Sequence, residues 1–407
     1  NFMQKASEFG LYLHIPFCRH RCAYCDFNTY AGMENLIGDY TGALCREIEQ
    51  AVAHFPPHAG VHTLFFGGGT PSLLPLSALE QVLSTVRARF TLTEEAEITL
   101  EANPGTVSPD YLRGLRALGI NRLSMGMQSA DPNDLRILER EHAYFDVVNA
   151  VKWARQAGFE NLNLDLIFGL PYQTLESWQR TLDLAVGLHP DHLSVYSLIL
   201  EHGTPMNAWV ARGLLNEPDD DLAAAMYAWA MERLPQAGYI HYEISNWARR
   251  DAEGQGMVCR HNLQYWYNLP YLGLGAGAHG FAGGVRTANV RAPKAYIERL
   301  SDATNRPLPP STDQPFREFP RTAATVNVTP IDRRTEMQET MMVGLRLVEA
   351  GVSGEGFETR FGEKIEGVFE KEIQELIGNG LLEWREGRVR LTERGKWMGN
   401  QVFMQFV

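Results

Sequence analysis

The sequence predicts an α/β domain of six strand–helix repeats, arranged as an open barrel, followed by a small α+β domain. Two observations support the barrel. Short apolar runs alternate with longer amphipathic segments from about residue 11 to residue 238. Most of these runs are apolar throughout, which is typical of the buried strands of a parallel sheet. A closed barrel of this kind needs eight repeats, and a flat doubly wound sheet is the alternative.

The predicted strands are short and the predicted helices follow them in regular order. The strands occupy residues 11–16, 63–66, 97–102, 122–127, 161–168 and 192–200. The helices occupy residues 36–54, 77–90, 109–118, 144–157, 176–188 and 219–234. Ser77 and Ser108 are suitable N-caps, Pro109 suits a first helical position, and Gly119 and Gly158 fit helix C-termini. Residues 1–238 therefore form the predicted barrel domain.

The rest of the chain divides into an extension and a second domain. Residues 239–330 are aromatic and glycine-rich, and residues 307–330 are rich in Pro and Thr, which predicts a barrel-closing extension that ends in a linker or crossover. In residues 331–407, predicted helices at 336–349 and 363–379 precede a hairpin over 381–391 with its turn at Glu386-Gly387. This order predicts a small winged-helix-like domain.

Charge and hydropathy restrict the classes of partner. The net charge of −12 argues against nucleic acid as the main partner, because Lys and Arg drive phosphate binding. No stretch of 18 or more apolar residues is present, and the amino terminus shows no secretion signal. We therefore expect a cytoplasmic protein, and leave a peripheral membrane contact and a homodimer open.

Three of the five cysteines lie within eight residues, directly after the first predicted strand. Cys18, Cys22 and Cys25 are spaced so that one loop can wrap three thiolates around a [4Fe–4S] cluster. Three ligands leave one iron open, and no fourth cysteine is near. The alternative is a zinc site completed by His14 or His20.

This Cys-x3-Cys-x2-Cys spacing is the signature of the radical-SAM superfamily, which the sequence resembles over essentially its whole length. The tetrapeptide His14-Ile15-Pro16-Phe17 is typical of the branch related to oxygen-independent coproporphyrinogen III dehydrogenase. The resemblance implies a partial (β/α)6 radical-SAM barrel whose open iron binds S-adenosylmethionine (SAM). It also implies that the cofactor supplies the radical chemistry.

The resemblance implies a SAM site at the ends of successive strands. Tyr12 matches a family tyrosine that lies beside the sulfonium of SAM. The segment Gly67-Gly68-Gly69-Thr70-Pro71 matches the family's glycine motif, which passes the amino group of the methionine part of SAM. Glu101, Gln128 and Asp165 match groups that bind the ribose or the amino group, and Arg140 matches a carboxylate-binding guanidinium. The implied SAM-binding residues are Tyr12, Gly68, Gly69, Thr70, Glu101, Gln128, Arg140 and Asp165.

Two further features separate members of this branch. The dehydrogenases have another cysteine at the position of Phe27, and they carry a longer amino-terminal extension. The segment from His261 to Trp266 matches the His-Asn-x-x-Tyr-Trp pattern of the HemW family of heme chaperones. The resemblance implies heme as a ligand, with His261, Tyr265 and Cys259 as candidate axial ligands. The alternative is a buried aromatic patch in which His261 is hydrogen-bonded.

The resemblance therefore favours a heme chaperone that carries a [4Fe–4S] cluster and SAM and transfers heme to apo-hemoproteins. A radical enzyme is the alternative, either a coproporphyrinogen III dehydrogenase or a radical methyltransferase. A regulator that binds DNA through the winged-helix-like domain is disfavoured by the acidic charge.

Overall fold

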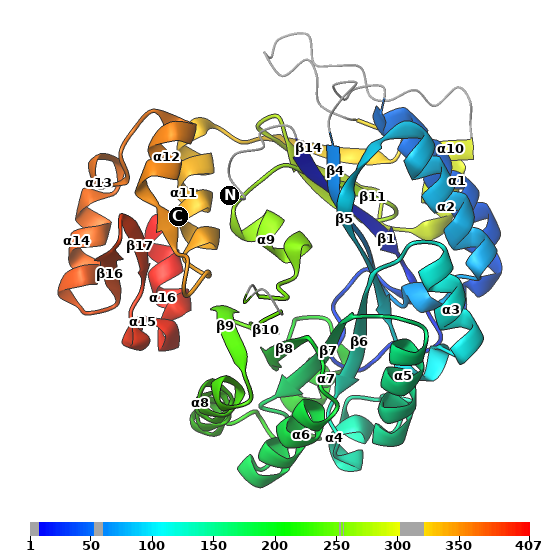
Figure 1. The fold of residues 1–407 in the computed structure, drawn as a ribbon, viewed down its shortest axis with the longest axis horizontal. Coiled ribbons are helices and arrows are strands. Elements are labelled where there is room, and N and C mark those ends of the chain that lie inside the picture. Colours follow the sequence, from blue (N-terminus) through cyan, green and yellow to red (C-terminus); the bar gives the residue numbers. More distant parts are fainter. Residues whose placement is uncertain (1–7, 53–59, 252–253, 255, 302–320) are drawn as a thin grey trace.

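A computed structural model describes residues 8–52, 60–251, 254, 256–301 and 321–407. Its main sheet has twelve strands in the order β14-β13-β12-β11-β1-β4-β5-β6-β7-β8-β10-β9. The six strands from β1 to β8 in that order are parallel, and their connecting helices surround the outer face of the curved sheet (Figure 1). In Figure 1 the helices that connect the parallel strands all lie on this outer face, as in an open barrel, whereas the doubly wound alternative would place them on both faces.

All six predicted strands and all six predicted helices are present. The strands are β1 Glu8–Ile15, β4 Gly60–Gly68, β5 Thr91–Ala102, β6 Arg122–Gln128, β7 Asn161–Phe168 and β8 His192–Ser197. The helices are α1 Ile37–Val52, α2 Leu76–Arg89, α3 Pro109–Ala117, α5 Tyr144–Gln156, α6 Leu175–Gly187 and α8 Asp220–Gln236. Ser108 accepts a hydrogen bond from Tyr111 N as the N-cap of α3. Ser77 is no cap, because α2 begins one residue before it, after Pro75.

The sequence did not predict several short elements. They are β2 Phe17–Cys18, β3 Tyr30–Ala31, α4 Pro132–Ile137 and α7 Pro205–Ala211. The outward-facing side chains Leu11, Leu13 and Ile15 of β1 are fully buried in the core beneath the helices. The alternate residues of the same strand, among them Tyr12 and His14, are polar or aromatic and face the interior of the barrel. This alternation leaves the inner face of the sheet available for chemistry.

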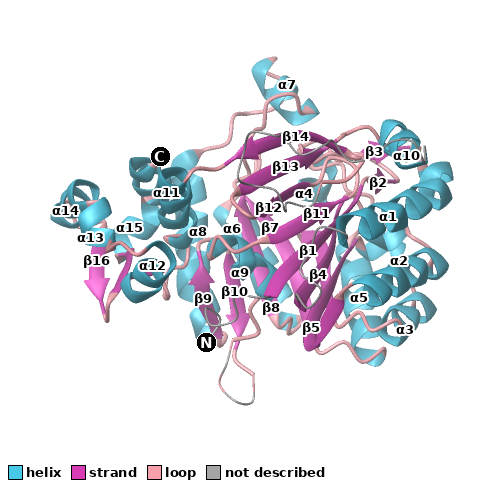
Figure 2. Cartoon of the chain, turned by 90° about the horizontal axis from the view of Figure 1, so that it is seen from above, coloured by secondary structure: helices cyan, strands magenta, loops and turns pink. Residues whose placement is uncertain are grey.

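The extension lengthens the sheet at both edges and does not join them. At one edge, β10 Asn246–Arg249 pairs with β8 and with β9 Tyr239–Glu243. At the other edge, β11 Tyr271–Leu274 pairs with β1 and is followed outward by β12 His279–Ala282, β13 Val285–Asn289 and β14 Thr325–Pro330 (Figure 2). Among the described residues, the strands of the extension therefore do not close the barrel by pairing with one another.

Part of the predicted linker is a strand. Residues 307–320 lie outside the described residues, but Thr325–Pro330 forms β14 and pairs with β13. The β-branched residues in Thr325-Val326-Asn327-Val328-Thr329 favour this conformation. Two helices complete the extension, α9 Arg260–Trp266 and α10 Pro293–Ser301.

The C-terminal domain has its own apolar core and a three-stranded sheet in the order β15-β17-β16. Its hairpin is confirmed: Glu386 and Gly387 have φ of 52° and 73°, as a two-residue turn requires. The second predicted helix is divided at Phe369. The elements are α11 Arg333–Gly344, β15 Val352–Ser353, α12 Gly354–Phe361, α13 Ile365–Val368, α14 Glu370–Gly378, β16 Leu382–Arg385, β17 Arg388–Leu391, α15 Glu393–Trp397 and α16 Gly399–Phe403.

This domain packs beside α9 at the open side of the barrel (Figure 1). Asn268 Nδ2 donates to Thr340 Oγ1 at 3.1 Å, and the Arg346 guanidinium lies 4.6 Å from the centre of the Trp266 ring. Among the described residues, no helix is long and apolar enough to cross a membrane.

Candidate functional site: the cysteine loop and the strand ends

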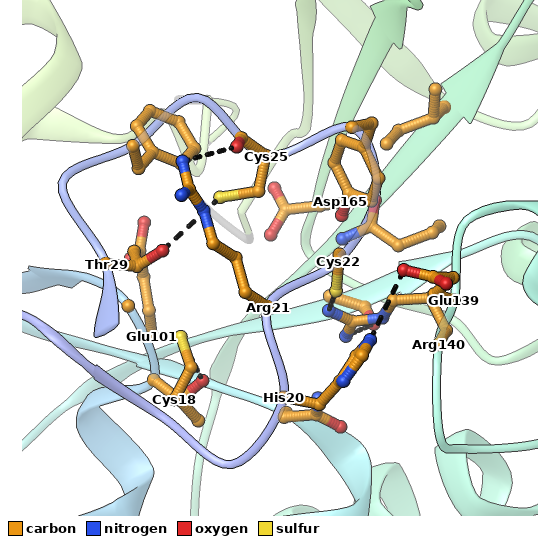
Figure 3. A pocket seen from close by; sticks show the side chains of 18 of the residues that line it. Cys18, His20, Arg21, Cys22, Cys25, Thr29, Glu101, Glu139, Arg140 and Asp165 are labelled. Atoms are coloured by element: carbon orange, nitrogen blue, oxygen red, sulfur yellow. Dashed lines mark hydrogen bonds and ion pairs between the residues drawn. The ribbon is translucent and has the colours of Figure 1, made fainter. Parts of the chain in front are cut away.

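The cysteine loop follows β1 and lies over the carboxyl ends of the parallel strands. Cys18, Cys22 and Cys25 line one cavity of about 580 Å³ (Figure 3). The loop is held in shape by pairing of Phe17 with Tyr30 and by a hydrogen bond from Cys25 N to Cys22 O at 3.2 Å. The three thiols predicted as metal ligands are therefore brought to one site.

Each sulfur has a polar neighbour. Thr70 Oγ1 donates to Cys18 Sγ at 3.6 Å, and the Arg140 guanidinium donates to Cys22 Sγ at 3.6 Å. Cys25 Sγ lies 3.9 Å from Thr29 Oγ1. Burial raises the pKa of Cys18 to about 11 and also raises the pKa of Cys25. Metal binding must therefore displace protons from these thiols, so cluster assembly is favoured by higher pH.

The arrangement does not assemble the alternative zinc site. Among the described residues, no group of three His, Cys, Asp or Glu side chains is placed to hold a single metal ion. Both nitrogens of the His14 ring are hydrogen-bonded, Nδ1 with Tyr12 OH at 3.0 Å and Nε2 with Asn28 O at 2.9 Å. His20 Nε2 lies 3.4 Å from Glu139 Oε2. A cluster suits the separated thiols better, because each thiolate binds a different iron.

Seven of the eight predicted SAM-binding residues line the same cavity as the cysteines. The exception is Tyr12, which lies beside Gly67 on the inner face of β1 and lines a neighbouring cavity. The seven residues are Gly68, Gly69, Thr70, Glu101, Gln128, Arg140 and Asp165. Gln128 has a positive φ of 64°, a conformation unusual for a residue with a side chain and often found at functional sites.

The two central glycines are required by close packing against the cysteine loop. A Cβ on Gly69 would lie 2.6 Å from Phe17 O, and Gly68 has a φ of 116°. Gly68 N donates to Glu101 Oε2 at 3.0 Å. Gly69 therefore allows the cysteine loop to pack against the end of β4, and Gly68 holds the glutamate at that same strand end, roles that are independent of any bound ligand.

Two buried carboxyl groups of the cavity, those of Glu101 and Asp165, have raised pKa values. Burial, with a contribution from Asp165, raises the pKa of Glu101 from about 4.5 to about 7. Burial also raises the pKa of Asp165, although Ser124 and Asn163 donate to it at 3.1 and 2.8 Å. Arg122 lowers both pKa values only in part, so burial remains the dominant cause, and a positively charged ligand would offset the cost of ionising the two carboxylates.

Tyr196 and Ser124 are among the cavity residues that the sequence did not predict. Tyr196 lies one residue before the end of β8 and is 42% exposed, and Ser124 on β6 donates to Asp165. The rule that active sites gather at strand ends did not point to Tyr196, because the predicted strand ran on to residue 200. His142, two residues after Arg140, also lines the cavity, and its Nε2 lies 3.0 Å from Met127 O.

The candidate heme ligands His261 and Cys259 lie outside this cavity, in the barrel interior on the amino-terminal side of the strand ends. Glu97 caps the start of α9: its oxygens accept from Arg260 N and His261 N at 3.1 and 3.0 Å and lie 3.8 Å from Cys259 Sγ. His261 and Cys259 are each 1% exposed. Thr63, at the level of His261, precedes Gly67 by four residues on β4, which is about 13 Å along a strand.

The His261 ring is fully hydrogen-bonded in this place. Its Nδ1 lies 2.9 Å from Thr63 Oγ1, and its Nε2 lies 2.9 Å from the hydroxyl of Tyr265. Burial lowers the pKa of His261 to about 3, so the ring is neutral. Neither nitrogen is free for an iron in this arrangement, which resembles the predicted alternative of a buried, hydrogen-bonded patch.

Comparison with known proteins gives the family. The Radical SAM superfamily model matches residues 12–185, and the HemN C-terminal domain model matches residues 331–398. The heme chaperone HemW of Bacillus subtilis (strain 168) is 37% identical over 97% of this chain and 98% of its own length. The chain belongs to the HemW family of radical-SAM proteins. The HemW heme chaperone of Escherichia coli K12 is 35% identical over the full length of both chains.

A solved structure shows the same fold for the HemW-family chain. The coproporphyrinogen III oxidase HemN from Escherichia coli has a TM-score of 0.80 and covers 100% of this chain and 92% of its own, at 24% identity. The superfamily implies a [4Fe–4S] cluster and SAM as cofactors. The C-terminal domain is therefore a HemN-type domain, and the sequence prediction of a partial radical-SAM barrel is confirmed.

The described side chains fit these cofactors. Arg140 donates to Gly126 O at 2.9 Å and to Cys22 Sγ, but its buried Nε has no hydrogen-bond partner among the described residues. An unpaired buried donor beside the thiols suits a ligand carboxylate, with Glu101 opposite for an ammonium or hydroxyl group. When bound, SAM and the cluster supply radical chemistry.

We expect SAM binding to release a proton below pH 7. Glu101 is largely protonated at pH 6 because its pKa is about 7, and a ligand that needs its carboxylate must displace that proton. SAM affinity should therefore rise as pH rises through 7 and level off above it. Titration calorimetry at pH 6 in buffers of different ionisation enthalpy measures the released proton.

Two variants test whether the released proton comes from the Glu101 carboxyl group. Glu101→Gln should bind SAM without proton release, whereas Glu141→Gln, an exposed residue of the same cavity, should behave like the wild type. Equal apparent heats in all buffers for the wild type would contradict the expectation.

Proposed function

We propose that this HemW-family protein binds heme and transfers it to apo-hemoproteins, with the cluster and SAM controlling heme binding or release. The observation that carries the proposal is Phe27, a 63% exposed phenylalanine that follows the third cluster cysteine by two residues. The dehydrogenase branch has a cysteine here. An exposed apolar ring beside the cluster loop suits contact with a flat apolar ligand.

The names of the full-length relatives support the same function, since both HemW proteins are heme chaperones. We place this activity in the cytoplasm, with heme and apo-hemoproteins as partners. The intact SAM cavity favours a second candidate, a radical enzyme that acts on a porphyrinogen or another small molecule.

The test gives anaerobically reconstituted protein hemin and coproporphyrinogen III in parallel. We expect a saturable Soret shift with hemin, transfer of that heme to an apo-globin, and no decarboxylation of coproporphyrinogen III under reducing conditions. Turnover of coproporphyrinogen III with formation of 5′-deoxyadenosine, together with no saturable hemin binding, would favour the enzyme and refute the chaperone.

A further inference from the structure

A second cavity, of about 570 Å³, lies on the inner face of the sheet between the cysteine loop and the added strands. Its volume is within the range of small-molecule sites. Phe27 lines this cavity as well as the cavity of the cysteines, so the two spaces meet at one side chain. Figure 2 shows β11, β12, β13 and β14 extending the sheet beyond β1, on the side where this cavity lies.

His279 is better placed to ligate iron than the other histidine and the tyrosines that line this cavity, since the Tyr265 hydroxyl is hydrogen-bonded to His261. His279 begins β12, its side chain is exposed, and its imidazole has no hydrogen bond to any described residue. Burial, with Arg286 and Arg291, lowers the pKa of His279, so its ring keeps a lone pair at neutral pH. His14, by contrast, is buried with both nitrogens occupied.

The walls of the cavity suit a flat apolar molecule. Phe27 and Val326 are 63% and 47% exposed, so both offer apolar surface to a ligand in the cavity. Tyr265 and Tyr271 are in contact edge to face, with ring centres 4.7 Å apart, and both line it. Aromatic rings of this kind stack against planar ligands.

A cation is available for an anionic group on the same ligand. Arg291 lines the cavity, is exposed, and forms no ion pair with the described residues. Arg286 is less available, because it pairs with Glu339 at 2.8 Å. A guanidinium without a partner is suited to a carboxylate such as a propionate.

The cysteine loop and the cavity wall are joined through Asn28. Its Nδ2 donates to Ala276 O at 3.0 Å and to Arg291 O at 2.9 Å. Gly277, with φ of 74°, packs so closely on Asn28 that a Cβ there would collide with it. The segment that leads into His279 is therefore held in place by the loop that carries the cluster cysteines.

We propose that this cavity is the heme site, with His279 as the axial ligand and Arg291 as the partner of a propionate. The assignment rests on the proposed function, because it names the place where that function's ligand is held. The assignment also gives a role to the His-Asn-x-x-Tyr-Trp segment. Tyr265 forms part of the cavity wall, and His261 holds the Tyr265 ring in position through the hydrogen bond to its hydroxyl.

The experiment is a hemin titration of the full-length, cluster-loaded protein by difference absorption. His279→Ala should weaken hemin binding roughly tenfold or more, and His279→Cys should bind hemin with a thiolate-type Soret band. Arg291→Gln should weaken binding by a smaller factor. His202→Ala, at an exposed histidine outside both cavities, is the matched control and should bind hemin like the wild type.

The outcomes separate the site from the function. Unaltered affinity and spectrum in His279→Ala, or loss of the Soret shift in His261→Ala alone with an unchanged melting temperature, would overturn the assignment and leave the chaperone function standing. A wild type without saturable hemin binding would overturn both. A spectrum that follows the substituted side chain at residue 279 supports the assignment, because only an iron ligand has that effect.

Discussion

Replacing Cys22 with alanine is expected to abolish cluster assembly. In the proposed cluster site each of the three thiolates would hold a different iron, so loss of one would leave two irons of the cubane without a protein ligand. The substitution also removes the sulfur to which Arg140 donates at 3.6 Å. Anaerobic reconstitution followed by iron analysis should find about four irons per wild-type chain and close to none in Cys22→Ala. SAM binding should be lost with the cluster.

Cys45→Ala is the control for this experiment. Cys45 is buried in the core on α1, far from the cysteine loop in the sequence, and lines neither cavity. It should therefore retain a full cluster. Retention of the cluster in Cys22→Ala would show that another side chain supplies the ligand, and would contradict the assignment of the three cysteines.

Replacing Glu47 with alanine is expected to lower the free energy of unfolding by roughly 3–5 kcal/mol. The Glu47 carboxylate is fully buried on α1. It accepts hydrogen bonds from Gly275 N, Asn289 Nδ2, Tyr296 OH and Thr322 Oγ1 at 2.6–2.8 Å. Alanine would leave these buried donors unpaired. Urea unfolding followed by circular dichroism measures the loss.

Glu49→Gln provides the comparison on the same helix. Glu49 is exposed and pairs with Arg89 at 2.9 Å, an exposed ion pair worth about 0–1 kcal/mol. A stability of Glu47→Ala within about 1 kcal/mol of the wild type would show that the carboxylate does not hold the extension against the barrel. Because Gly275 precedes the segment that leads to His279, hemin binding should weaken in parallel with stability.

The elements that sequence reasoning found are those with local signals. Continuous apolar runs predicted the six parallel strands. The resemblance to the radical-SAM superfamily named Glu101, Gln128 and Asp165, and these residues do line one cavity with the cysteines. Their gathering follows from the fold, because parallel strands bring their carboxyl ends to one edge. Tyr12 does not line the cavity of the cysteines, because it lies three residues before the carboxyl end of β1 and lines the neighbouring cavity.

Features that depend on long-range pairing could not be predicted in this way. Nothing local shows that residues 239–249 and 271–330 join opposite edges of one sheet. The partners of Glu47 on the extension are more than 220 residues away in the sequence. The position of His261 depends on Glu97 and Thr63, which lie on two other strands. The sequence shows that His261 is followed by aromatic residues, but it does not show that His261 lies inside the barrel, away from the strand ends.

The position of Phe27 has a consequence for two ligands that are bound at the same time. Its side chain lines both the cavity of the cysteines and the second cavity. With SAM in the first cavity and heme in the second, the two ligands would share this apolar ring, and the affinity for one would then depend on the presence of the other.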